Sequence, residues 1–94
     1  MSRLVAVGLS FRTAPVAVRE RASLDEGAAR LLLRALRAGG AVREALALST
    51  CNRTELYALA DDPVAGERAL LAALAAHTAI GAEQLRRCAF AVAD

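Results

Sequence analysis

The apolar residues of this chain change their spacing from one segment to the next, and this change constrains the fold more than any other feature. Alternating apolar residues predict strands, and apolar residues three or four positions apart predict helices. The alternating segments are residues 4–10, 44–50, 53–60 and 87–93. The helical segments are a short one over residues 16–22 and two longer ones over residues 28–38 and 63–81. The longer elements therefore follow the order β, α, β, β, α, β.

That order is typical of a ferredoxin-like sandwich, an α+β fold in which helices cover one face of an antiparallel sheet. A chain of 94 residues is long enough for one such domain and too short for two. Hydrophobic residues make up 56% of the chain and the mean hydropathy is +0.37. These values exclude intrinsic disorder, so we expect one packed domain over residues 1–94.

Short polar and glycine signals indicate where the helices begin and end. Ser23 and Glu26 have the spacing of a capping box ahead of the first long helix, and the glycine pair at 39–40 is expected to end it. Asp62 and Pro63 have the residue types of an N-cap and a first helical residue. The second long helix is therefore expected to begin at Pro63.

Charge and composition exclude several classes of function. The 12 basic residues, all arginines, face 10 acidic ones, so the net charge of +2 says little about partners. Two Phe, one Tyr and no Trp are too few for an aromatic platform that stacks single-stranded nucleic acid. Two distant cysteines do not make a zinc site or a disulfide framework, so we expect no metal and a cytoplasmic location. The sequence also predicts neither a membrane span nor a signal peptide.

The most reactive side chains lie in residues 49–55, Ser-Thr-Cys-Asn-Arg-Thr-Glu, where one predicted strand turns into the next. The short Cys51-Asn52 connection predicts a hairpin, and Asn52 suits a positive φ at such a turn. If the second strand begins at Cys51, its period of two puts Cys51, Arg53 and Glu55 on one face, roughly 6.5–7 Å apart. A nearby guanidinium favours the reactive thiolate and can bind a carboxylate with two hydrogen bonds. The pattern suits a nucleophile beside an anion-binding residue.

Each of these residues also has a simpler structural interpretation. A lone cysteine such as Cys51 is often an inert buried residue, and Arg53 and Glu55 can form an ordinary surface pair. Cys88 is expected to be structural, because it falls in the apolar strand predicted beside Phe90. Of the two thiols, the polar setting of Cys51 favours it as the reactive one.

Two other classes of function stay open at this point. In a non-catalytic binding module, the helical row Arg30, Arg34 and Arg37 would contact RNA phosphates or a protein, although such a row is usually a solvated helix face. In a hydrolase or acyltransferase, His77 would act as the base beside Cys51. His77 is expected in the last turn of a helix, where it more simply opposes the helix dipole.

Two stretches of the chain match a known family. The first is Gly8 to Val16, GLSFRTAPV, followed by Arg19-Glu20, and the second is LSTCNRTELY over residues 48–57. They closely resemble the N-terminal catalytic domain of glutamyl-tRNA reductase, and the resemblance covers the whole chain. Because that family is several times longer, we expect this chain to be one domain of a longer enzyme.

The resemblance implies an activity and a set of site residues. The family reduces glutamyl-tRNA with NADPH to glutamate-1-semialdehyde, at the entry to tetrapyrrole and porphyrin biosynthesis. It implies that Cys51 is the nucleophile, which forms a thioester. The residues that it places in the substrate-binding segment are Thr50, Asn52 and Arg53. Supporting roles are implied for Arg12, Thr13, Ser49 and Glu55.

One motif departs from the family, and several partners are implied outside this chain. The family commonly has Asn-His-Lys where this chain has Ser10-Phe11-Arg12. Any role of the family's lysine can therefore pass only to Arg12. The scattered glycines do not form a dinucleotide loop, so NADPH is expected to bind another domain. The resemblance further implies a homodimer formed through C-terminal helices and suggests glutamate-1-semialdehyde aminomutase as a partner.

Overall fold

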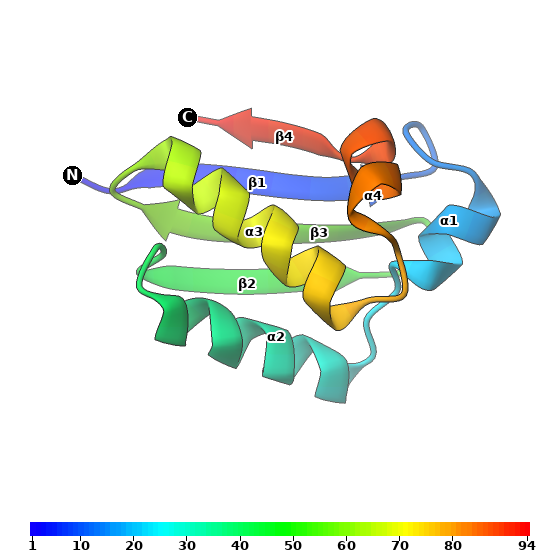
Figure 1. Ribbon diagram of the computed structural model, residues 1–94, viewed down its shortest axis with the longest axis horizontal. Coiled ribbons are helices and arrows are strands. Elements are labelled where there is room, and N and C mark those ends of the chain that lie inside the picture. Colours follow the sequence, from blue (N-terminus) through cyan, green and yellow to red (C-terminus); the bar gives the residue numbers. More distant parts are fainter.

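The computed structural model describes all residues from Met1 to Asp94. The strands are β1 (Arg3–Ser10), β2 (Glu44–Ser49), β3 (Arg53–Ala60) and β4 (Phe90–Ala93). The helices are α1 (Val16–Arg21), α2 (Glu26–Gly39), α3 (Pro63–His77) and α4 (Ala82–Cys88). The strands form one sheet in the order β2-β3-β1-β4, and every neighbouring pair is antiparallel (Figure 1). The ferredoxin-like α+β fold predicted from the sequence is confirmed.

The core lies between the sheet and the two long helices. Alternate residues of the central strands β1 and β3 are buried against buried leucines of α2 and α3. They are Val5, Val7, Leu9, Leu56, Ala58 and Ala60 from the strands and Leu32, Leu36, Leu70 and Leu74 from the helices. This burial supplies most of the stability of the fold, because removing apolar surface from water is the dominant favourable term in folding.

The opposite face of the sheet is not covered by a helix. Leu46 and Leu48 of β2 share one face, as the alternation predicts, but that face is the open one, and Leu46 is 56% exposed. Ala45 and Ala47 pack against the core instead. The short alanines suit this position because α2 packs close to β2.

Helix α2 begins at a different cap from the one predicted. The carboxylate of Asp25 accepts a hydrogen bond from the Ala28 backbone N–H at 2.8 Å, so Asp25 is the N-cap and the Ser23 capping box is wrong. Ser23 still belongs to the end of α1, because its backbone N–H donates to the Glu20 carbonyl. The predicted glycine stop is confirmed, since Gly40 ends α2 with φ of 81°.

The C-terminal part of the chain contains a helix that the sequence pattern did not predict. As expected, Asp62 caps α3 and Pro63 begins it, but α3 ends at His77 rather than Gly81. The Thr78 hydroxyl donates to the Leu74 carbonyl at 2.5 Å, and the chain leaves the helix there in an extended conformation.

Helix α4 then occupies the first part of the predicted strand 87–93. Leu85 is buried, and Cys88 is the last residue of α4 rather than a strand residue. Leu85 and Cys88 lie three positions apart, a spacing that also fits one face of a helix. The expected packing of Cys88 against the core is confirmed. None of the helices has both the length and the apolar character that a membrane span needs.

Candidate active site

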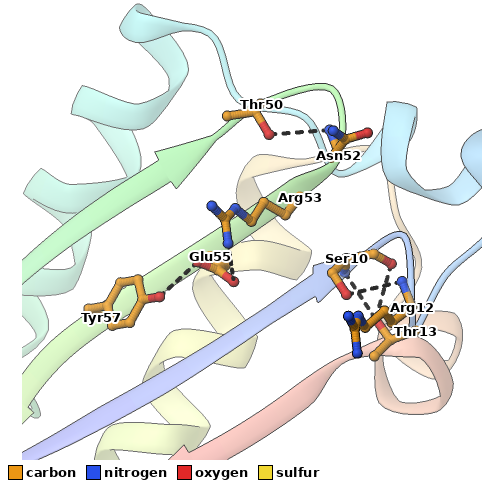
Figure 2. Close-up of polar contacts among 8 residues, drawn as sticks. All are labelled: Ser10, Arg12, Thr13, Thr50, Asn52, Arg53, Glu55 and Tyr57. Carbon is orange, nitrogen blue, oxygen red and sulfur yellow. Dashed lines mark hydrogen bonds and ion pairs between the residues drawn. The ribbon is translucent and has the colours of Figure 1, made fainter.

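The turn between β2 and β3 presents the cysteine that the sequence analysis singled out. The Thr50 backbone N–H donates to the Arg53 carbonyl at 2.7 Å, and the Asn52 backbone N–H donates to the Thr50 hydroxyl at 3.2 Å (Figure 2). Cys51 lies between these residues and is exposed. The predicted hairpin is confirmed, but Asn52 does not have a positive φ. The Thr50 hydroxyl stabilises the turn without a left-handed residue.

Hydrogen bonds below the turn fix it to the body of the domain. The hydroxyls of Ser49 and Thr54, opposite one another on β2 and β3, lie 2.9 Å apart. Ser49 Oγ also accepts the Leu24 backbone N–H at 3.0 Å. Ser49 therefore links the hairpin to the segment that joins α1 to α2, and this link holds the turn in place.

Cys51 lines a hollow between the turn and α1. The hollow has a volume of about 400 Å³. Its lining is mostly polar and comprises Val16, Arg19, Glu20, Ser23, Thr50, Cys51 and Asn52. Arg19, Glu20 and Ser23 are not among the predicted site residues, although Arg19 and Glu20 belong to the motif that carries the family resemblance. Their approach to Cys51 depends on how α1 folds back over the hairpin.

A second polar cluster lies on the open face of the sheet. Arg53, Glu55 and Tyr57 are alternate residues of β3 (Figure 2). The Tyr57 hydroxyl donates to Glu55 Oε1 at 2.7 Å, and an Arg53 guanidinium nitrogen lies 4.0 Å from Glu55 Oε2. The hydrogen bond to Glu55, followed by burial, raises the pKa of Tyr57 above its usual 10.0. The predicted neighbourhood of Arg53 and Glu55 is confirmed.

Glu55 is buried, with only 7% of its surface exposed. Gly8 of β1 pairs with Glu55 and has no side chain to occupy the space beside it. A Cβ at Gly8 would lie 3.0 Å from Glu55 Cγ. The missing side chain is thus what allows the carboxylate to lie against the sheet between Arg53 and Tyr57.

The prediction that Cys51 shares one strand face with Arg53 and Glu55 is wrong, because β3 begins only at Arg53. Cys51 lies in the turn before β3 begins, and the lining of its hollow does not include Arg53 or Glu55. The thiol and the Arg53–Glu55 pair are therefore neighbours along the chain, with the thiol beside α1 and the ion pair on the open face of the sheet.

The loop after β1 lies at the same end of the sheet as the cysteine turn (Figure 2). Ser10, the last residue of β1, pairs with Arg53. The Thr13 hydroxyl accepts the Ser10 backbone N–H at 3.0 Å, and the Thr13 backbone N–H donates to the Ser10 carbonyl. Thr13 thus shapes the loop, whereas the exposed Arg12 guanidinium lies 5.5 Å from the centre of the Phe11 ring.

Comparison with known proteins identifies the family of this chain. The model of the glutamyl-tRNAGlu reductase N-terminal domain matches residues 7–94. The chain belongs to this family. A glutamyl-tRNA reductase of Streptomyces coelicolor is 49% identical over 82 residues, which cover 87% of this chain and 14% of the relative.

Two further glutamyl-tRNA reductases are also similar to this chain over a short part of their length. That of Synechococcus sp. strain RCC307 is 44% identical over 89 residues, or 95% of this chain and 20% of the relative. That of Xanthomonas campestris strain B100 is 58% identical over 57 residues, or 61% of this chain and 13% of the relative. The chain thus spans a fifth or less of the length of these glutamyl-tRNA reductases.

The remaining polar candidates of this family member lie away from Cys51. His77 is in the last turn of α3, as predicted, and lines a hollow between α2 and α3 that shares no residue with the hollow of Cys51. This placement disfavours a hydrolase in which His77 serves Cys51 as a base. Arg30, Arg34 and Arg37 form an exposed row on α2, where Arg30 pairs with Glu26 at 2.7 Å.

Proposed function

We propose that this chain is the acyl-capturing domain of a glutamyl-tRNA reductase. The observation that carries the proposal is the exposed Cys51 in the turn between β2 and β3, which lines an open polar hollow. A thiol in this position is accessible to a large substrate. Family membership supports glutamyl-tRNA as that substrate.

The proposed step is a transfer of the glutamyl group from oxygen to sulfur. The Cys51 thiolate attacks the ester carbonyl carbon, a carbon–sulfur bond forms, and the carbon–oxygen bond to the terminal ribose breaks. The released ribose oxygen takes up the proton that the thiol lost, so the products are a thioester and a tRNA with a free hydroxyl. Such covalent catalysis divides one difficult reaction into two easier steps.

Arg53 is proposed to hold the side-chain carboxylate of the glutamyl group. Its guanidinium side chain is 52% exposed and lies 4.0 Å from Glu55, beyond hydrogen-bond distance, so its donors are free for a ligand. Glu55 in turn limits the positions that Arg53 adopts, and Tyr57 holds Glu55. A planar guanidinium binds a carboxylate with two parallel hydrogen bonds, which favours glutamyl over uncharged acyl groups.

The residues present do not fit NADPH, the proposed hydride donor. All neighbouring strands are antiparallel, so the chain contains no parallel strand–helix–strand unit of the kind that binds dinucleotides. In the proposed enzyme NADPH therefore binds outside residues 1–94, and this chain alone should not form the semialdehyde. The dimer, the aminomutase partner and the cytoplasmic location stay predictions.

Mass spectrometry of the 94-residue chain after mixing with glutamyl-tRNA tests the proposal. We expect one glutamyl group on Cys51, no adduct with Cys51→Ala, and an undiminished adduct with the matched control Cys88→Ala. An adduct on Cys88, or tRNA binding that persists in Cys51→Ala without any adduct on the wild type, would contradict acyl capture. The second result would favour the RNA-binding module instead.

A further inference from the structure

Arg19 has a partly buried guanidinium without a partner. Its Nε and Nη1 atoms are enclosed by protein and make no hydrogen bond. None of the four ion pairs of the structure involves Arg19. Buried charged donors are nearly always paired, because leaving one unpaired costs several kcal/mol. No carboxylate of the domain therefore compensates the guanidinium charge of Arg19, which points to an anionic ligand.

The place for such a ligand is the hollow that Arg19 shares with Cys51. Nη2 is the one guanidinium nitrogen that is not enclosed, and Arg19 is part of the lining of the hollow. Glu20 is the only acidic residue of that lining, and it does not pair with Arg19. Thr50, Asn52 and the other polar lining residues supply neutral groups. Arg19 is thus the single positive charge beside the thiol.

We propose that Arg19 is a positioning residue that binds an oxyanion of the substrate in this hollow, next to Cys51. The inference rests on the proposed function, in which the glutamyl ester reaches Cys51. That substrate carries two kinds of oxyanion near the ester, the terminal phosphates of the tRNA and the glutamyl carboxylate. The Nη2 group of Arg19, which is not enclosed, can donate charge-assisted hydrogen bonds to either.

The two arginines proposed to bind the substrate have different surroundings, which supports separate roles. Arg53 has Glu55 beside it, on the open face of the sheet. Arg19 has no carboxylate in pairing distance and lies on the α1 side of the turn. An anion bound at Arg19 lies on the side of the hollow away from Glu20, because like charges repel. Neutralising Glu20 should therefore strengthen binding.

Protection of Cys51 against alkylation tests this site without requiring any acyl transfer. The probe anions are inorganic phosphate and glutarate, and the reagent is the neutral iodoacetamide, whose own approach does not depend on Arg19. We expect at least one anion to slow labelling of wild-type Cys51. Arg19→Gln should weaken this protection about ten- to hundredfold, the effect of losing a charged hydrogen bond.

Matched variants separate the site from a general charge effect. Arg21→Gln, on the same helix and outside the hollow, should protect like the wild type, and Glu20→Gln should protect at a lower anion concentration. Arg19→Lys keeps the charge without the planar guanidinium and should fall between wild type and Arg19→Gln. The lysine variant also tests the site if Arg19→Gln does not fold. The anion that protects more strongly identifies the source, phosphate or carboxylate.

Two results would overturn the proposal: no protection of the wild type by either anion, or equal protection of wild type and Arg19→Gln. Its failure is distinguishable from failure of the proposed function. Arg19-dependent protection without a glutamyl adduct would keep the anion site and reject acyl capture. A glutamyl adduct without Arg19-dependent protection would keep acyl capture and reject the anion site.

Discussion

Replacing Gly8 with alanine should destabilise the domain and disturb the Glu55 carboxylate. The added Cβ would lie 2.6 Å from the Thr54 backbone oxygen and 3.0 Å from Glu55 Cγ. The Thr54 oxygen belongs to central strand β3, which cannot shift without disturbing its pairing with β1. Overpacking of this kind costs about 1–3 kcal/mol. This cost exceeds the stabilisation of roughly 0.4–1 kcal/mol that a Gly→Ala change contributes by restricting the unfolded chain.

The expected net loss is about 1–2 kcal/mol, which corresponds to a Tm lower by about 4–16 °C for a domain of this size. Thermal unfolding followed by circular dichroism measures it. Gly27→Ala is the matched control, because Gly27 is helical and the nearest atom to its Cβ is a side-chain oxygen at 3.5 Å. The control should unfold at or above the wild-type Tm. A Gly8→Ala variant as stable as wild type would refute the close-packing argument.

Three further predictions concern the site. Limited alkylation with iodoacetamide should label the exposed Cys51 well before the half-buried Cys88, and the reverse order in the folded chain would contradict the assignment. Arg53→Ala should weaken glutamyl capture by about one to two orders of magnitude, with Arg53→Lys intermediate, whereas an undiminished adduct without Arg53 would remove it from the site. Tyr57 is the only tyrosine, so its ultraviolet absorbance titration should have a midpoint above pH 10.0, and Glu55→Gln should lower that midpoint. Because the folded-state pKa is raised, stability is lost as pH rises above 10.0 through that pKa, and Tyr57→Phe should lose less over the same range.

Local pattern was sufficient for the order of the main elements. Alternation predicted β1, β2 and β3, and the glycine pair at 39–40 predicted the end of α2. Alternation failed at the C-terminal end, where the Thr78 hydrogen bond ends α3 early and α4 forms. Over a few residues, apolar spacing is compatible with both a strand and one face of a helix, so only packing against the core decides between them.

The residues around Cys51 show what the sequence by itself determined and what the tertiary structure decided. The motif over residues 48–57 determined which thiol, arginine and carboxylate share a hairpin, because those relations depend only on neighbours along the chain. The burial of Glu55 depends on Gly8, from a strand far earlier in the chain, and the lining beside Cys51 depends on α1. Periodicity says which residues of a strand share a face, but not which face is covered or which distant residue lies opposite. Those relations arise only when the strands pair and α1 folds against the hairpin, which is why Arg19 lines the hollow beside Cys51 only in the folded protein.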